Sequence, residues 1–341
     1  MKDKVIFKKD NPDIKEMCDF LNPSFKNPVV DATYTPDFWK WKHFDNPDGK
    51  SLMFVAKHNN KIVGARPLWK NTLSYKGKDF DALQCVDSAV HPAMRGRRIF
   101  SNLNKYAMDN VKNVVVFNSP NENSVRAFVR GGWANIRGFN TYFRPLRLSA
   151  LFKYLTNYIL SKRRLTRKLK IPKIENAKGI SKEPPKKIKE VLRVNNETLK
   201  DFVTIKIDEK WLNWRIKNPT NAPYYFFQPF KDQNFVIIFY LRNNSGLRTI
   251  HVLDILADYR NDRLISKGIG CFLKFAKRYV EGISLSVTDN HPLTKTILKK
   301  RFVKMRIKNL TVKLEKLKSK LAKDFLNPDK WAVMISVFDG G

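Results

Sequence analysis

The sequence has few cysteines and no long hydrophobic segment. Its three cysteines, Cys18, Cys85 and Cys271, are too few and too scattered for a disulfide framework or a zinc site. The longest apolar runs, such as residues 235–241, have the length of a strand and cannot span a bilayer. The N-terminus lacks the apolar region of a secretory signal. We therefore expect a soluble, cytoplasmic protein with no metal site and no transmembrane segment.

Acidic side chains are also scarce. The chain has 31 Asp and Glu residues and 66 Lys and Arg residues, so its net charge is +35. Such an excess favours anionic partners, whether phosphorylated ligands, nucleic acid or an acidic membrane surface, but does not choose among them. A hydrophobic content of 43% is enough for a packed core, and 341 residues suggest two domains.

The second half of the chain repeats the first in order. Three pairs of segments match: Trp41 with Asn46-Pro47 and Trp214 with Asn218-Pro219, residues 85–107 and 252–276, and residues 121–133 and 289–302. The offsets between matching positions stay within 167 to 173 residues. Three matching pairs of segments in the same order along the chain predict two copies of one α/β unit.

We expect the first unit at residues 1–147 and the second at residues 191–341. Between them, residues 148–190 contain an amphipathic pattern up to residue 170 and a basic linker with Pro184-Pro185. The favoured interpretation is a packed helix followed by a solvated linker. The alternative is a contact with an acidic surface.

A cluster of arginines lies between a predicted strand and a predicted helix. The strand covers residues 82–90, and Ile99, Leu103 and Ala107 share one face of the helix that follows. The first amides of a helix have no internal acceptors, and Gly96 allows a ligand to approach the backbone closely. Arginine side chains bind phosphate in a forked geometry. The segment therefore predicts a site for a phosphorylated ligand.

Two segments resemble motifs of a known superfamily. The stretch VHPAMRGRRIFSNL (90–103) is similar to motif A of the GNAT N-acyltransferases, and NENSVRAFVRGGW (121–133) looks like motif B. The predicted hairpin 51–69 lies where that family has its second and third strands. The tandem arrangement resembles acyltransferases of surface-polysaccharide pathways and, more distantly, Fem-type peptidyltransferases. The resemblance implies an α/β (α+β) fold with two tandem GNAT-like domains, each a mixed, mostly antiparallel sheet flanked by helices.

The resemblance also implies a donor and its binding residues. The donor is acetyl-CoA or another acyl-CoA, and the acceptor is a primary amine, with an amino sugar of a surface glycan as one candidate. The implied contacts are the amides of Arg95, Gly96, Arg97, Arg98, Ile99 and Phe100 for the pyrophosphate, Ser88 and Val90 for the pantetheine arm, and Asn121 and Ser124 for the thiol end. Phe128 stands where many members have a tyrosine that protonates the departing thiolate. Another group, water or a free thiolate must serve in its place.

Three residues are candidates for removing a proton from the amine. Asp87 is on the motif A strand, although the matching Asp254 in the second copy favours a structural role. His91 and Glu122 are weaker candidates. The second copy lacks the proline and the arginine cluster, so we expect it to have a structural or acceptor-side role.

Two other functions remain open at this stage. The positive charge suits a Fem-type enzyme that uses aminoacyl-tRNA, because phosphate contacts dominate the binding of nucleic acids. Phe128 and the basic linker also suit a non-catalytic binder of nucleic acid or acidic lipid.

Overall fold

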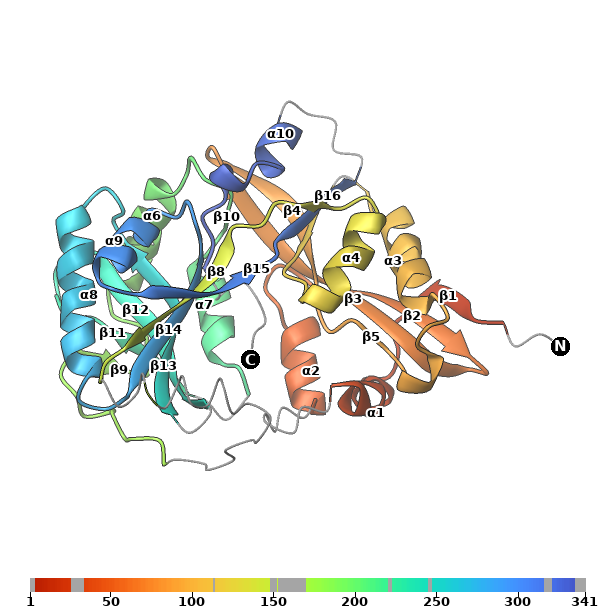
Figure 1. Ribbon diagram of the computed structural model, residues 1–341, viewed down its shortest axis with the longest axis horizontal. Coiled ribbons are helices and arrows are strands. Elements are labelled where there is room, and N and C mark those ends of the chain that lie inside the picture. The colour runs from red at the N-terminus through yellow and green to blue at the C-terminus, as the bar shows by residue number, and fades with distance from the viewer. Residues whose placement is uncertain are drawn as a thin grey trace.

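Two mixed β-sheets lie side by side in the computed structural model, with helices packed on their faces (Figure 1). The structure describes residues 4–25, 34–112, 114–147, 152, 170–219, 223–244, 247–315 and 321–334. The predicted amphipathic helix at residues 148–170 therefore lies almost entirely outside the described residues. Both sheets combine antiparallel pairs with one parallel pair, which confirms the expected fold class.

The first half contains the elements that its sequence pattern predicts. They are β1 (Ile6–Lys9), α1 (Ile14–Ser24), α2 (Pro36–His43), β2 (Leu52–His58), β3 (Lys61–Tyr75), β4 (Lys78–Cys85), β5 (Ala89–Val90), α3 (Ile99–Asp109), β6 (Val114–Asn118), α4 (Glu122–Arg130), β7 (Ala134–Asn135) and β8 (Phe139–Pro145). The turn of the predicted hairpin is Asn59-Asn60, both with positive φ, as in a tight two-residue β-hairpin.

The second half repeats this order of elements. They are β9 (Ile180–Ser181), α6 (Ile188–Thr198), β10 (Thr204–Ile205), α7 (Glu209–Ile216), β11 (Tyr224–Phe227), β12 (Phe235–Asn244), β13 (Leu247–Ala257), α8 (Asp262–Ala276), β14 (Gly282–Thr288), α9 (Leu293–Lys299), β15 (Val303–Lys308), β16 (Thr311–Glu315) and α10 (Ala322–Phe325). The first sheet has the order β1-β2-β3-β4-β6-β16-β7, and the second has β9-β11-β12-β13-β14-β8-β15. Corresponding strands occupy corresponding places, so the tandem repeat is confirmed.

The two halves exchange one strand each. β8 follows the first half in sequence but lies in the second sheet, between β14 and β15, whereas β16 of the second half lies between β6 and β7 of the first sheet. Figure 1 shows the yellow-green β8 among the strands of the second half. β8 therefore completes the sheet of the other half and not that of its own half. Neither sheet is complete without the other half of the chain.

Part of the segment expected to be a solvated linker, within residues 148–190, is packed on the rest of the protein. Ile174 and Ile188 are buried in the core, and β9 pairs with β11 at the edge of the second sheet. Apolar side chains within the basic segment explain this difference, because burying them ties the segment to the second half.

Two tryptophans join the halves at the centre of the molecule. Trp41 of α2 and Trp214 of α7 stack with ring centroids 4.8 Å apart. Each indole Nε1–H donates to the backbone carbonyl of the other residue, and both N···O distances are 2.9 Å. Since buried polar groups need partners, this reciprocal pair fixes α2 against α7 in a single register.

We predict that Trp41→Phe and Trp214→Phe each lower the free energy of unfolding by about 1–3 kcal/mol more than Trp69→Phe does. Each substitution leaves a buried carbonyl without its donor. Trp69 packs on Trp214 in the same core, and its Nε1 has no hydrogen-bond partner in the described part of the chain, so it controls for loss of indole bulk. Urea unfolding measures the difference. Equal losses for all three variants would contradict the prediction.

Candidate active site

The parallel ladder between β4 and β6 in the first sheet is short. β4 pairs with β6 only from Ala82 to Gln84. After Cys85 the chain leaves this ladder, and β5 pairs with β3 alone. Asp87, at the bend, has a φ of +45°, a left-handed conformation that a non-glycine residue rarely adopts. The strand expected at residues 82–90 is therefore interrupted, and an opening forms where β4 and β6 diverge.

The arginine-rich turn lies directly after this opening. A hollow of about 280 Å³ is lined by Val90, Met94, Arg95, Gly96, Arg98, Ile99 and Phe100. Gly96 has a φ of +81°, and a Cβ built on it would meet no atom within 4 Å. The backbone at this point is therefore open to a ligand.

The amides of this turn are available for hydrogen bonding. Within the described residues, the amides of residues 96–100 donate to no acceptor, and the N-cap residue Arg98 makes no side-chain cap. The guanidinium groups of Arg97 and Arg98 are exposed, while Arg95 Nε lies 3.4 Å from the carbonyl of Val90. Free amides at a helix start beside arginines form an anion site.

A glycine on β3 brings this helix start close to the sheet. A Cβ on Gly64 would lie 3.1 Å from Ile99 Cγ2 and 3.4 Å from Leu103 Cδ2. The missing side chain lets α3 pack tightly on β3, which places its first turn at the diverging strands.

Arg66 is a buried cation beneath the site that the sequence interpretation missed. It is 1% exposed, its Nη1 donates to Ser88 Oγ at 3.1 Å, and its Nη2 donates to Asn104 Oδ1 at 2.8 Å. Its guanidinium carbon lies 4.8 Å from the ring centroid of Phe128 and 5.5 Å from that of Phe100. Three predicted site residues thus converge on this side chain.

No carboxylate pairs with Arg66 in the described structure, and its Nε has no partner. Burial lowers the pKa of the guanidinium from its usual value, because desolvation disfavours its charge. The signal in the sequence was a lone arginine within an otherwise apolar stretch of β3, at a position that faces the core.

The carboxylate of Asp87 is bound by residues of α2 and of the segment before it. Its side chain is 5% exposed, and Lys42 Nζ lies 2.6 Å and His43 Nε2 3.0 Å from Oδ2. The hydroxyl of Tyr34 donates to Oδ1 at 2.7 Å. The neighbouring cation Lys42 and these hydrogen bonds outweigh burial and hold the pKa of Asp87 well below its usual range. Both carboxylate oxygens therefore already accept hydrogen bonds.

His43 is neutral in this cluster near pH 7. Burial lowers its pKa to about 4 despite the nearby carboxylate, and its Nδ1 lies 2.9 Å from Ser51 Oγ. Lys42, His43 and Tyr34 were not predicted, since nothing in their spacing indicates that they meet Asp87.

The other predicted residues lie apart from this cluster. His91 is exposed, and its Nδ1 accepts the amide of Ala93 at 3.3 Å, which caps the short helix Pro92–Met94. Glu122 is exposed in the first turn of α4, whose N-cap is Asn121. Asn121 accepts the amide of Ser124 at 3.0 Å, so these two residues form a helix cap. Whether they contact a ligand stays a prediction.

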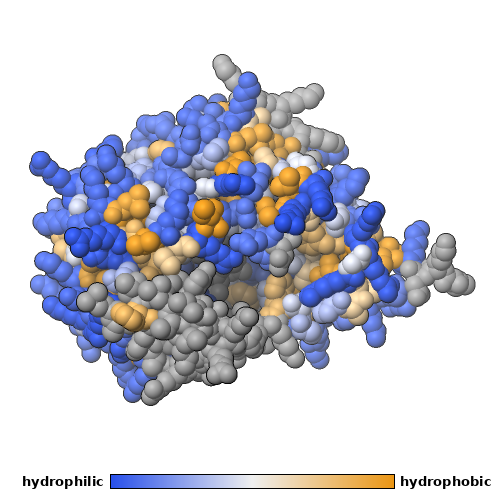
Figure 2. Space-filling model, in the orientation of Figure 1, coloured by the Kyte–Doolittle hydropathy of each residue, from blue (hydrophilic) through white to orange (hydrophobic). Residues whose placement is uncertain are grey.

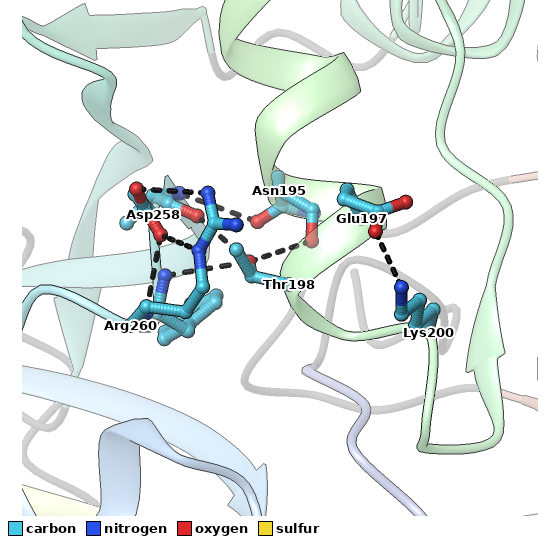
Figure 3. A network of polar contacts seen from close by, with 8 residues as sticks. Asn195, Glu197, Thr198, Lys200, Asp258 and Arg260 are labelled. Carbon is cyan, nitrogen blue, oxygen red and sulfur yellow. Dashed lines mark hydrogen bonds and ion pairs between the residues drawn. The ribbon is translucent and has the colours of Figure 1, made fainter.

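Several amides of the corresponding turn of the second half are occupied by the protein's own acceptors. Asn195 and Thr198 of α6 accept the amides of Ala257 and Tyr259, and Asp258 accepts both the amide and Nε of Arg260 (Figure 3). Asn261 caps α8 by accepting the amide of Leu264 at 3.0 Å. The amides of Ala257, Tyr259, Arg260 and Leu264 are therefore occupied, whereas those of residues 96–100 have no acceptor in the described part of the chain.

The second opening is filled as well. Beyond its ladder with β13, β14 pairs with the segment Trp331–Met334, through Val287 and Met334 and through the amide of Thr288 and the carbonyl of Val333. Gly268 and Gly270 of the second half lie inside α8. A Cβ on Gly268 would lie 2.4 Å from the ring of Phe235, so this glycine serves helix–sheet packing.

Two further properties bear on the class of site. Within the described ranges, no three His, Cys, Asp or Glu side chains gather as metal ligands. None of the described helices combines the length and apolar character needed to cross a bilayer.

Comparisons with known proteins agree with this geometry. Residues 8–134 match the model of the acetyltransferase (GNAT) domain. No curated protein matches the sequence. Among solved structures, a probable N-acyltransferase of Enterococcus faecalis is 12% identical with a TM-score of 0.62, and the match covers 92% of this chain and 73% of that one.

Two more structures show the same fold. A GCN5-related N-acetyltransferase of Anabaena variabilis is 10% identical, with a TM-score of 0.63 and coverage of 91% of this chain and 73% of that one. The N-myristoyltransferase of Saccharomyces cerevisiae with bound myristoyl-CoA is 14% identical, with a TM-score of 0.56 and coverage of 90% and 82%. Residues 8–134 therefore match the acetyltransferase (GNAT) domain, within a chain that has the tandem-sheet fold of these solved structures.

Proposed function

We propose that this protein transfers an acyl group from an acyl-CoA, bound at the turn after Pro92, to a primary amine. The observation that carries the proposal is the row of free amides at residues 96–100, beside exposed arginines and an open hollow. A pyrophosphate has the charge and the acceptor oxygens that such a helix start binds. The second half, whose turn amides are occupied, supports the first structurally.

The reaction exchanges one bond to the acyl carbon for another. The amine nitrogen attacks the thioester carbonyl, a C–N bond forms, the C–S bond breaks, and CoA leaves as a thiolate. The attacking nitrogen loses a proton and the thiolate gains one. The carbonyl oxygen carries negative charge between these steps and needs positioned N–H donors.

The bend between β4 and β5 is suited to donate to that oxygen. The amides of Asp87 and Ser88 make no backbone hydrogen bond in the described structure, and they lie where the strands diverge. The three side chains that bind the Asp87 carboxylate hold the left-handed conformation of this bend. We assign Asp87 a positioning role, because its occupied oxygens and lowered pKa make it a poor proton acceptor. His91 and Glu122 remain proposals for that step.

Arg66 is suited to stabilise the departing thiolate. Phe128 has no hydroxyl to donate, yet the ring of Phe128 lies directly over the uncompensated guanidinium. A buried cation acts strongly on nearby negative charge because little water screens it. We infer that Arg66 favours the thiolate form of the leaving group.

The acceptor side is open to two proposals. We propose that the amine enters near the seam between the two halves, and an amino sugar of a surface glycan is one candidate acceptor, on family resemblance alone. A Fem-type reaction with aminoacyl-tRNA needs no pyrophosphate site, so the free turn amides favour acyl-CoA over that alternative.

Gly96→Glu tests the proposed donor site. We expect acetyl-CoA at about 100 times its dissociation constant to stabilise the wild type by about 2.7 kcal/mol, and to leave Gly96→Glu unchanged, because the carboxylate repels the pyrophosphate. Thermal melting with and without the ligand measures this. Gly77→Glu is the matched control, since Gly77 also has a positive φ of +70° and no atom near its Cβ position.

Acetyl-CoA stabilisation of the wild type and of Gly77→Glu but not of Gly96→Glu supports the site. Equal stabilisation of all three overturns the assigned turn. Stabilisation by tRNA but by no CoA ester overturns acyl-CoA as donor in favour of the Fem-type alternative.

Arg66→Met tests the role of the buried cation. We expect kcat to fall by about 100-fold while the dissociation constant of acetyl-CoA stays within threefold, because the turn amides are unchanged. Adding Phe128→Tyr to Arg66→Met should raise kcat again by at least tenfold, because the new hydroxyl can donate to the thiolate. Release of free CoA thiol with a panel of primary amines measures both. Failure of Phe128→Tyr to restore activity would show that Arg66 acts only in packing.

Tyr34→Phe tests the positioning of the bend. Loss of one charge-assisted hydrogen bond to Asp87 should lower kcat by about tenfold and change the KM for acyl-CoA less than twofold. Tyr142→Phe is the control, because its hydroxyl donates to Asp289 at 2.9 Å in the second half. A change in KM alone, or equal effects of both variants, would contradict the assignment.

A further inference from the structure

The outer side of α8 carries a hollow that the proposed acyl transfer does not use. Its volume is about 650 Å³. The lining includes three cations of α8, Arg263, Lys267 and Lys274, and a fourth, Lys300, which follows α9. Figure 2 shows mainly hydrophilic surface at the left end of the molecule, where α8 lies in Figure 1. We call this site the α8 hollow.

Positive charge in the α8 hollow is poorly compensated. The four cations share the hollow with a single carboxylate, that of Asp262. Within the described ranges none of the four forms an ion pair, although the Nζ of Lys267 lies 5.0 Å from the ring centroid of Phe230. Cations that lie together without counterions repel one another, so an anion in the hollow lowers their electrostatic energy.

Gly270 points to a ligand independently of the charge. It lies in the interior of α8, where glycine is less favourable than alanine by about 1 kcal/mol. Packing does not require it: in the described structure a Cβ on Gly270 would meet only Lys300 Nζ, at 3.7 Å, whereas a Cβ on Gly268 would lie 2.4 Å from the ring of Phe235. Gly270 therefore leaves open space beside the amine of Lys300, inside the hollow.

We propose that the α8 hollow binds an oligophosphate group, that is, two or three linked phosphates, on a small molecule. Such a group concentrates several negative charges within the reach of all four cations. Arg263 can bind one phosphate in a forked geometry, and the three lysines act as point charges on the others. The volume of the hollow is that of a small-molecule site.

This site is separate from the proposed donor turn. The donor turn offers backbone amides at the start of α3, whereas the α8 hollow offers side chains along the length of α8. The inference is therefore independent of the proposed acyl transfer.

Other ligands fit the α8 hollow less well. A membrane surface needs apolar side chains that enter it, and no large apolar residue lines the described hollow. A nucleic acid carries one charge per nucleotide along an extended backbone, so it matches a compact group of cations poorly. The lining residues also include no aromatic side chain on which a base could stack.

Cys271 provides a local probe of this site. It lines the hollow and is partly exposed, whereas Cys18 and Cys85 are buried. Burial raises the pKa of each of these two thiols to about 11, so both are protonated near pH 7. The uncharged reagent N-ethylmaleimide should therefore alkylate Cys271 first.

Protection of Cys271 tests the proposal on the full chain. We expect saturating tripolyphosphate to slow the alkylation of Cys271 by about fivefold or more, because it occupies the hollow, and sodium chloride of equal ionic strength to slow it less than about twofold. Intact-mass measurement over time gives the rate. ATP is the second probe. Equal protection by ATP and tripolyphosphate supports recognition of the phosphates alone, and protection by ATP at a lower concentration supports a nucleotide as their source.

Two pairs of variants separate charge at the site from other effects. Lys274→Gln with Lys300→Gln should weaken tripolyphosphate binding by about tenfold. Lys61→Gln with Lys78→Gln should leave it unchanged, because it removes the same charge from exposed positions on the first sheet. Gly270→Glu should weaken binding by about tenfold more than Gly270→Gln, since the two side chains have the same size and only the carboxylate repels phosphate. Thermal melting confirms that each variant is folded.

Protection that is lost in Lys274→Gln with Lys300→Gln and kept in the first-sheet control supports the proposal. Equal protection by sodium chloride, or equal behaviour of the two lysine pairs, shows diffuse attraction and overturns it. Equal effects of Gly270→Glu and Gly270→Gln also overturn it. Stronger protection by RNA, compared per phosphate, overturns an oligophosphate in favour of a nucleic acid. Gly96→Glu should keep full protection, and its loss would overturn a site separate from the donor turn.

Discussion

The reciprocal contact between Trp41 and Trp214 is the constraint on which the rest of the structure depends. Each buried indole donates to the backbone of the other, so the two helices α2 and α7 can meet in only one register. Lys42 and His43 follow Trp41 directly on α2 and bind Asp87 at the bend of the motif A strand. A contact between the halves therefore also sets the backbone at the proposed reaction centre.

The exchange of β8 and β16 strengthens this dependence. Each sheet is completed by a strand from the other half, and one hydrophobic core runs between the sheets. The halves are symmetric in their order of strands but not at their ligand turns. The first turn leaves the amides of residues 96–100 without an acceptor in the described chain, while α6 and Asp258 occupy three amides of the second. A duplicated scaffold can thus keep one binding site and use the other copy for support.

Much of the proposed donor site follows from local sequence. Gly96 between arginines, at the start of a helix with a clear apolar face, predicts an anion site because the reasons are local: positive φ, free helix-start amides and guanidinium charge. The buried cluster could not be predicted in this way. Tyr34, Lys42, His43 and Arg66 are distant in sequence from the residues they bind, and a charged residue in a strand or helix pattern is ordinarily read as exposed. Only burial against the other elements reveals that these side chains meet.

The sequence by itself determined the repeat, the order of helices and strands, and the position of the proposed anion site, because hydrophobic periodicity and turn chemistry act over a few residues. The tertiary structure alone decided which sheet receives β8 and β16, since a strand of given pattern can complete either sheet. It also decided that Asp87 is held by three side chains and that Arg66 lies uncompensated beneath Phe128. These properties arise from desolvation and from contacts between distant segments, neither of which is present in the extended chain.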